Sequence, residues 1–154
     1  IEQYCNSHGI VPCIDITNLS DDYTRNDIRH NVLPDILMRC SSDVIVRTMD
    51  ILTADEEFLH EYSLNIADKY IFYGENFAQI NVKDFSKLHL AIRRRLIRLI
   101  ADYLNIEAGL VHIDACIDLA QKNYGGKYVV LPGGFIAKIS KGIIIFEEVQ
   151  KNDK

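Results

Sequence analysis

The sequence has 154 residues, of which 48% are hydrophobic and 25% are charged, so it can bury a core as one domain or as two small ones. No apolar run is long enough to cross a bilayer and no signal-peptide pattern opens the chain, so we expect a cytoplasmic protein without a membrane partner. The net charge of -5 argues against indiscriminate nucleic-acid binding, which usually requires a strongly basic domain.

The sequence predicts a short helix at the start of the chain and a flexible tail at its end. A short helix is predicted from Glu2 to Ser7, and the chain begins inside it, at Ile1 and without an initiator methionine. We therefore expect a fragment of a longer protein. The last residues, 149–154, are polar and are expected to form a flexible tail.

The four cysteines are scattered, at Cys5, Cys13, Cys40 and Cys116. None belongs to a Cys-x-x-Cys pair, so we interpret them as reduced and mostly buried thiols. Cys5, His8 and Cys13 offer three zinc ligands, but a fourth ligand at ordinary spacing is missing. No metal site is therefore predicted.

The segment from Asp15 to Pro34 holds polar residues more densely than a buried element tolerates, which indicates a site. Its first half is rich in short side chains that favour turns and helix caps, namely Asp15, Thr17, Asn18, Ser20, Asp21 and Asp22. Asp22 is the predicted N-cap of a helix from Tyr23 to about His30. We expect Pro34 to kink this helix or to begin a new one.

Within this predicted helix, Arg25 and Arg29 lie four residues apart on one face, where two guanidiniums can grip an anion. Asn26 lies beside the pair. His30 has polar neighbours that would orient it toward a substrate, although no proton transfer is assigned to it. The apolar face that would dock the helix consists of Ile28, Val32 and Ile36.

The middle of the chain is predicted to hold a long helix and two short strands. The helix runs from Asp43 to about Asp68, with a break near Thr53 to Asp55, where Thr53 and Glu56 resemble a capping box. A domain boundary is placed at its start. Strands are predicted at 70–73 and 77–82 around a turn, and their aromatic residues suit a core better than a platform for bases.

A basic stripe follows these strands. A single amphipathic helix is predicted, with its apolar side formed by Phe85, Leu88, Ile92, Leu96, Leu99, Ile100 and Tyr103. Its cations are Lys87, Arg93, Arg94, Arg95 and Arg98. Arginine on a rigid helix suits bidentate phosphate contact, whereas a solvated face with local ion pairs is the plain alternative. His89 and His112 are expected to pack or cap and not to catalyse.

The C-terminal part is predicted to add one helix and three strands. The helix spans 111–124, with Gly125 as its C-cap. The strands, at 127–131, 135–139 and 142–147, form a meander. The last strand contains consecutive apolar residues, so it should be central or covered on both faces. The predicted class is α+β, with helices packed on a small antiparallel sheet.

The opening segment resembles the tRNA(Ile)-lysidine synthetase family. That family's pattern is Asp, Ser or Thr, Asn, a spacer, Tyr, and then Arg-Asn and Ile-Arg, each separated by one residue. The matching positions are Asp15, Thr17, Asn18, Tyr23, Arg25, Asn26, Ile28 and Arg29. Eight residues at fixed spacing rarely match by chance, and the order of the later elements is also similar to that of the family. The resemblance therefore covers nearly the whole chain.

The resemblance implies an ATP-dependent tRNA-modifying ligase. Such enzymes use ATP with magnesium to adenylate C2 of the wobble cytidine of tRNA(Ile) with a CAU anticodon, and free lysine then displaces AMP to form lysidine. Their Ser-Gly-Gly-x-Asp-Ser phosphate loop is absent from this chain, whose close glycine pairs, at 125–126 and 133–134, lie in predicted turns. Neither cofactor is therefore expected in this fragment, which would be inactive alone.

The same resemblance implies a division of labour along the chain. Residues 1–41 would be the C-terminal piece of the catalytic PP-loop domain, a helical remnant of an α/β ATP-pyrophosphatase fold, and residues 42–148 a substrate and tRNA-recognition domain. Substrate binding would fall to Asp15, Thr17, Asn18, Tyr23, Arg25, Asn26, Arg29 and His30. Binding of tRNA would fall to Lys87, Arg93, Arg94, Arg95 and Arg98. Catalytic residues are unassigned, and a homodimer is compatible with this assignment.

Two alternatives stay open. A noncatalytic RNA-binding or protein-docking module would keep the fold without the chemistry. A related thiolating tRNA modifier would need reactive or cluster-binding cysteines, and the four cysteines here do not cluster.

Overall fold

The computed structural model describes residues 2–11, 20, 22–122 and 126–149, and it divides into two compact units. Unit 1 comprises Ile1–Thr53 and unit 2 comprises Ala54–Lys154. The division lies within the long helix, whereas the boundary predicted from the sequence coincides with the start of that helix. The predicted tail is described only at Val149, and its other residues lie outside the described ranges.

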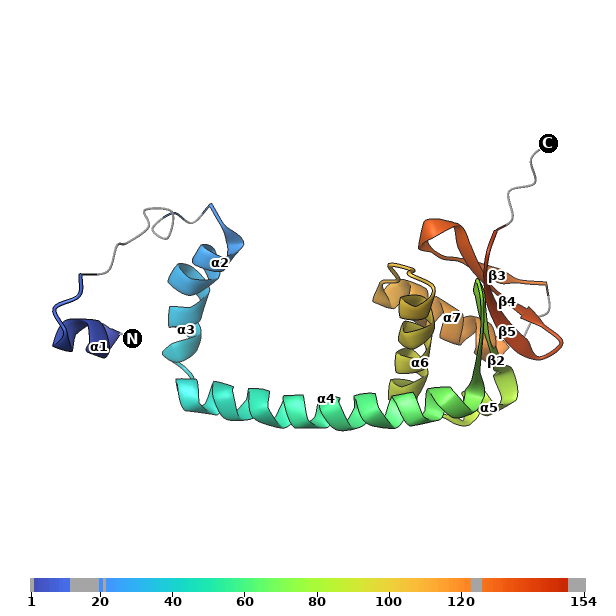
Figure 1. Cartoon of the computed structure of the whole chain (residues 1–154), viewed down its shortest axis with the longest axis horizontal. Helices are drawn as coiled ribbons and strands as arrows, with labels where there is room; N and C mark the ends of the chain where they lie inside the picture. Colours follow the sequence, from blue (N-terminus) through green and yellow to red (C-terminus); the bar gives the residue numbers. More distant parts are fainter. Residues whose placement is uncertain (1, 12–19, 21, 123–125, 150–154) are drawn as a thin grey trace. The chain divides into compact units, whose positions relative to one another are not determined.

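The described part of unit 1 is built from short helical segments that precede the long helix (Figure 1). They are α1 (Glu2–Ser7), α2 (Thr24–Asp27), the π-helix η2 (Ile28–Val32) and α3 (Leu33–Leu37). The predicted helix at the start of the chain is confirmed. Pro34 lies in the first turn of α3, and the two residues before it, Val32 and Leu33, are also helical. The π-helix η2 therefore passes directly into α3, and a new α-helical segment begins next to this proline, which is one of the two outcomes expected there.

The long helix α4 runs from Ser42 to Tyr70 without interruption. The break predicted near Thr53 is wrong, because Glu56 forms an ion pair with Arg95 instead of a capping box. A helix with no glycine or proline between its ends can continue through such a local signal. Among the described residues, none of the helices combines the length and the apolar character that crossing a bilayer would require.

Unit 2 contains a five-stranded antiparallel sheet in the order β1-β2-β5-β4-β3. The strands are β1 (Ile71–Gly74), β2 (Phe77–Asn81), β3 (Tyr128–Val130), β4 (Phe135–Ser140) and β5 (Ile143–Glu148). The short 3-10 helix η3 (Pro132–Gly134) joins β3 to β4. Each strand begins and ends within one or two residues of its predicted position, and β5 is central, as its apolar sequence indicates.

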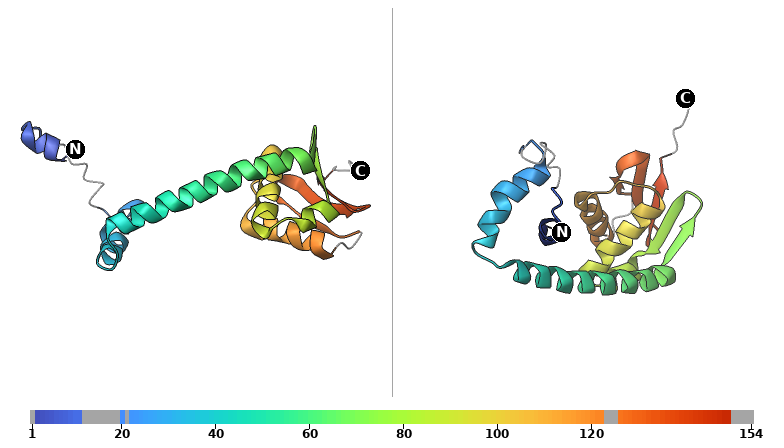
Figure 2. Two further views of the ribbon diagram at one scale, coloured as in Figure 1. Left: turned by 90° about the horizontal axis from the view of Figure 1, so that it is seen from below. Right: turned by 60° about the vertical axis from the view of Figure 1, so that its left-hand side comes forward.

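The helices of unit 2 cover one face of this sheet (Figure 2). They are α5 (Val82–Lys87), α6 (Leu90–Tyr103) and α7 (Leu110–Lys122). Phe85, Leu96 and Ile100 from the helices meet Ile144 and Phe146 from the sheet in one buried cluster. The predicted α+β class is therefore confirmed, with helices packed on a small antiparallel sheet.

The single helix predicted across residues 85–103 is wrong, because the chain leaves the helical conformation at Leu88 and His89. Asn81 caps α5 by accepting the backbone N–H groups of Lys83 and Asp84. The side chain of His89 caps α6 in the same way. The apolar spacing continues across the break, so periodicity alone could not reveal it.

Candidate functional site

The polar segment singled out in the sequence is only partly described by the structure. Asp15, Thr17 and Asn18 lie outside the described residues. The remaining predicted substrate-binding residues lie on two consecutive helical segments of unit 1: Tyr23, Arg25 and Asn26 on α2 or at its N-terminus, and Arg29 and His30 on η2.

Asn26 is a bracing residue and not an exposed ligand. Its side chain is only 6% exposed, and its Nδ2 donates a hydrogen bond of 2.8 Å to the backbone carbonyl of Ser20. Its backbone N–H donates to the carbonyl of Tyr23 at 2.8 Å. A buried amide with fixed partners is costly to remove, so Asn26 ties the incoming loop to the start of α2.

The predicted cap at Asp22 is wrong. Tyr23 occupies the N-cap position of α2, and it makes no side-chain cap hydrogen bond. The carboxylate of Asp22 instead accepts the hydroxyl of Ser20, whose oxygen accepts the backbone N–H of Asp22 at 3.2 Å. This local turn uses the carboxylate that the helix would have needed.

Arg25 and Arg29 are both exposed, and within the described residues neither side chain has an ion-pair or hydrogen-bond partner. The chain passes from α-helix to π-helix between them, at Ile28. A π-turn takes more residues per turn than an α-turn, which brings residues four apart closer to one line along the helix. That these two guanidiniums bind one anion stays a prediction. Turns of π-helix are frequent at functional sites.

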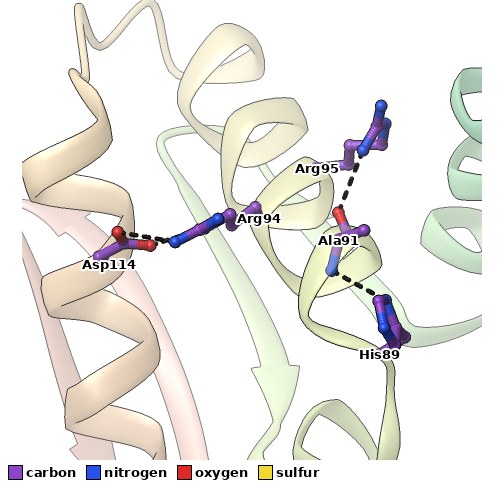
Figure 3. Close-up of polar contacts among 5 residues, drawn as sticks. All are labelled: His89, Ala91, Arg94, Arg95 and Asp114. Carbon is purple, nitrogen blue, oxygen red and sulfur yellow. Dashed lines mark hydrogen bonds and ion pairs between the residues drawn. The ribbon is translucent and has the colours of Figure 1, made fainter. Parts of the chain in front are cut away.

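The basic stripe of unit 2 has a different character, because most of its cations already have partners. Arg94 forms a two-point contact with Asp114 of α7, with Nε to Oδ1 at 2.8 Å and Nη2 to Oδ2 at 3.0 Å (Figure 3). The hydrogen bonds to Asp114 raise the pKa of Arg94 above its usual value. This pair joins α6 to α7.

Three more cations of the stripe are bonded within unit 2. Arg95 pairs with Glu56 of α4 and reaches the carbonyl of Ala91. Arg98 donates to the carbonyl of Ala108 at 2.8 Å, in the loop that leads to α7. Lys87 lies on α5 and pairs with Asp84 at 3.0 Å, so it does not share a helix face with the arginines.

Arg93 and Arg98 are the cations of this stripe that have no acidic partner among the described residues. The Nε of Arg93 is buried without a hydrogen-bond partner in the same ranges. A guanidinium has five N–H donors, so one carbonyl bond leaves Arg98 with donors for a further acceptor. If unit 2 binds phosphate through α6, these two residues are the better candidates, and Arg94 and Arg95 serve first to hold the helices together.

Two histidines of unit 2, His89 and His112, and its cysteine, Cys116, have structural roles. His89 accepts the N–H of Ala91 at 3.2 Å, and His112 accepts the N–H of Gly109 at 3.1 Å, so both act as caps, as predicted. Burial raises the pKa of the Cys116 thiol to about 12, which makes it unreactive at neutral pH. In the described part of the chain, no three His, Cys, Asp or Glu side chains gather to hold a metal ion.

No protein-family model matches the chain, but individual proteins do. It is 30% identical to the tRNA(Ile)-lysidine synthase of Clostridioides difficile over 100% of this chain and 35% of that protein. It is 32% identical to the synthase of Clostridium acetobutylicum over 94% of this chain and 32% of that protein. The synthase of Bacillus subtilis is 34% identical over 85% of this chain and 29% of its own length.

This chain belongs to the tRNA(Ile)-lysidine synthase family. It spans about a third of the length of these curated relatives. Because the similarity to the first of them covers the whole chain, it includes both the polar segment of unit 1 and the α+β unit. The resemblance inferred from eight residues is thereby confirmed.

The acidic partners of the arginines were missed by reasoning from sequence. Asp114 and Glu56 are separated from Arg94 and Arg95 by 20 and 39 residues, and only tertiary packing brings them together. One local signal was available and was overlooked. Asn81 followed by Asp84 is an N-terminal capping pattern, and it would have placed the start of α5 correctly.

Proposed function

We propose that this chain is part of an ATP-dependent ligase that joins lysine to C2 of the wobble cytidine of tRNA(Ile) with a CAU anticodon, forming lysidine in the cytoplasm. The observation that carries the proposal is the similarity to named tRNA(Ile)-lysidine synthases, which extends along the whole chain. The co-substrates would be free lysine and ATP.

The burial pattern of unit 1 supports its assignment to the end of the catalytic domain. Among its described residues, Asn26 alone is buried, and the predicted docking face of Ile28, Val32 and Ile36 is exposed. An apolar helix face of this kind normally packs against another element. We assign that element to the α/β part of the full ligase, so residues 1–41 would complete a domain whose core lies elsewhere.

In this proposal the polar segment borders the reaction centre. Arg25 and Arg29 hold phosphate charge during adenylation, because they are exposed and lack internal partners among the described residues. Asn26 braces them through its bond to Ser20. The roles of the other predicted residues are binding roles without an assigned ligand: Asp15, Thr17, Asn18, Tyr23 and His30. An acidic side chain such as Asp15 suits the amine of lysine.

The described residues do not form a complete binding site for the phosphates of ATP and magnesium. The pair Gly133–Gly134 lies in η3, between two strands, and not at the start of a long helix that could hold a phosphate. The described residues also contain no cluster of carboxylates suited to a divalent ion. The proposal therefore assigns the nucleotide loop and the metal to the rest of the full ligase.

The first experiment tests the catalytic assignment in the full-length ligase. Arg25→Ala and Arg29→Ala should each lower lysine-dependent modification of unmodified tRNA(Ile) at least about tenfold, which corresponds to the loss of one charge-assisted phosphate contact. Lys83→Ala, an exposed cation on α5, serves as the control and should leave the rate unchanged. Full activity of both arginine variants would contradict the assignment.

The second experiment tests tRNA recognition with the 154-residue chain. Unmodified tRNA(Ile) with a CAU anticodon should bind more tightly than another tRNA, with an affinity that falls as salt rises. Arg98→Ala should weaken binding and reduce the salt slope by about one. Arg94→Ala should have a smaller effect, because Asp114 already occupies that guanidinium. Equal binding of both tRNAs would favour the docking-module alternative.

A further inference from the structure

The C-terminal end of α6 and the loop that follows it line a hollow of about 380 Å³. Its walls come from Arg98 and Asp102 of the helix and from Asn105, Ile106 and Glu107 of the loop. This volume lies within the range of roughly 300–1,000 Å³ that is typical of ligand sites. The hollow therefore offers room for a small chemical group, and four of its five lining side chains are polar.

The shape of this hollow is fixed by its own contacts. The backbone N–H of Ile106 donates to the carbonyl of Ala101, and that of Ala108 donates to the carbonyl of Ile106, both at 2.8 Å. The side chain of Ile106 is only 4% exposed, so it anchors the loop in the core. Arg98 holds the far end of the loop through the carbonyl of Ala108. Walls held in this way lose little conformational entropy when a ligand binds.

Most of the polar groups around the hollow have no internal use. Arg98 and Asp102 are four residues apart on α6, a spacing that commonly gives an ion pair. Among the described residues no such pair forms between them, and the side chains of Asp102, Asn105 and Glu107 have neither a hydrogen-bond nor an ion-pair partner. Arg98 has donors beyond the one that bonds Ala108. These groups are therefore free to bind a ligand.

The charges that line the hollow restrict the kind of ligand. Two carboxylates, Asp102 and Glu107, only accept hydrogen bonds, and the guanidinium of Arg98 only donates them. A phosphate would lie beside both carboxylates, and an ammonium group would lie beside the guanidinium, so like charges oppose each of them. The lining suits a neutral group that carries donors and an acceptor along one edge. Nucleobases have such edges, and unpaired bases of RNA expose them.

Guanine matches this lining better than the other bases. Its Watson–Crick edge has three N–H groups, on N1 and N2, next to the acceptor O6. Adenine and cytosine each have two, on a single amino group, and uracil has one. Two carboxylates therefore find more donors on guanine. Arginine donating to O6 and N7 of guanine is also the commonest base-specific contact of proteins with nucleic acids.

We propose that this hollow binds the edge of an unpaired guanine of RNA. Asp102 and Glu107 accept the N–H groups on N1 and N2, and Arg98 donates to O6. The inference rests on the proposed function in one respect, because the RNA that supplies this guanine is the tRNA bound by unit 2. Asp102 and Glu107 then select the base, a role that a purely electrostatic contact with the RNA backbone does not require.

Binding of short RNAs to the 154-residue chain tests the base preference. The probes are the ribotrinucleotides UGU, UAU, UCU and UIU, in which I is inosine, and affinities are measured from the shifts of backbone amide signals in nuclear magnetic resonance spectra. UGU should bind at least about tenfold more tightly than UAU or UCU, and UIU, which lacks the N2 amino group, should bind more weakly than UGU. Equal affinities, or a preference for UAU or UCU, would overturn the proposal.

Two substitutions of nearly equal size test the carboxylates. Asp102→Asn and Glu107→Gln should each reduce the preference for UGU, because an amide replaces two acceptor oxygens by one acceptor and one donor. Both side chains are exposed, so the circular dichroism of the chain should not change. Asp118→Asn removes the same charge from an exposed position on α7 outside the hollow and should leave the preference intact. A preference for UGU that survives both substitutions would contradict the proposal.

Binding of tRNA gives a test with opposite expected signs. Asp102→Asn removes a negative charge, so a purely electrostatic contact predicts tighter tRNA binding, whereas a guanine contact predicts binding about tenfold weaker. Unchanged or tighter binding would overturn the assignment of this guanine to tRNA. The proposed function can fail separately: a chain that prefers UGU but does not distinguish tRNA(Ile) from another tRNA would support the guanine site and count against tRNA(Ile) recognition by this chain.

Discussion

The two units of this chain bury their apolar residues very differently. Every hydrophobic side chain of the buried core among the described residues belongs to unit 2, from Ala67 to Phe146. In the described part of unit 1, the buried residue is a polar one, Asn26. The stability of the chain therefore resides in unit 2. Unit 1 contains the polar segment with Arg25 and Arg29. The apolar face of its helices is exposed, so this face requires a packing partner that the described residues of unit 1 do not supply.

The largest difference in unfolding free energy should appear when one leucine in each unit is replaced by alanine. Leu96→Ala removes a fully buried side chain of α6 and should cost roughly 2–5 kcal/mol of unfolding free energy. Leu37→Ala removes a side chain that is 42% exposed on α3 and should change stability by no more than about 0.5 kcal/mol. Urea unfolding followed by circular dichroism measures both. Equal losses would show that unit 1 has a core of its own.

Alkaline pH should weaken unit 2 through Cys116, because burial raises the pKa of this thiol from 9.0 to about 12. The folded thiol keeps its proton where the unfolded thiol loses it, so its contribution is complete below pH 9 and declines as pH rises toward 12. Between pH 8 and 10 the loss is roughly 1.4 kcal/mol. The test compares the unfolding free energy of the unchanged chain with that of Cys116→Ala across this pH range. If the two curves of unfolding free energy against pH are parallel, the prediction is wrong.

The cap of α6 gives a smaller effect in the same unit. His89→Ala removes the acceptor for the N–H of Ala91 and should cost about 1 kcal/mol. His89→Asn should restore most of this loss, because asparagine is a good N-cap residue. Thermal unfolding of the three proteins checks both statements. If asparagine is no better than alanine, the side chain of His89 stabilises by packing and not by capping.

The smallest effect is expected for the contact between α6 and α7. Arg94 and Asp114 are both about two-fifths exposed, so solvent screens their attraction. A double-mutant cycle with Arg94→Ala and Asp114→Ala should yield a coupling of roughly 0.2–1 kcal/mol that declines with salt. A coupling above this range would indicate that the pair is a principal support of unit 2.

Sequence patterns located most elements of unit 2 because their burial is periodic. The strands alternate inward and outward residues, and α6 repeats its apolar residues at helical spacing, so local order and tertiary packing agree. The errors lie where two local signals compete. At Leu88 and His89 the apolar spacing favoured one helix, but both residues are extended and the side chain of His89 caps the start of a second helix. At Thr53 a capping pattern suggested a break, but α4 continues through it.

The candidate site was predicted less completely, for a physical reason. Arg25 and Arg29 could be recognised as a candidate pair because they lie four residues apart in a predicted helix, and this spacing is visible in the sequence. The partners of Arg94, Arg95 and Arg98 depend on how α4, α6 and α7 pack, which spacing does not record. The consecutive isoleucines of β5 predicted a strand that is central or covered on both faces, and the strand order confirms that it is central.

The strand order has a consequence for how the chain folds. Strand β2 pairs with β5, so Ala78 lies opposite Phe146. Between these two strands the described chain contains three α-helices, the 3-10 helix η3 and two strands. Contacts between such distant segments form late, because the intervening loop must close before they are made. During synthesis β2 therefore leaves the ribosome long before its central neighbour exists. A nascent chain that ends before Ile143 holds two separate strand pairs, and the last strand joins them into one sheet from the middle.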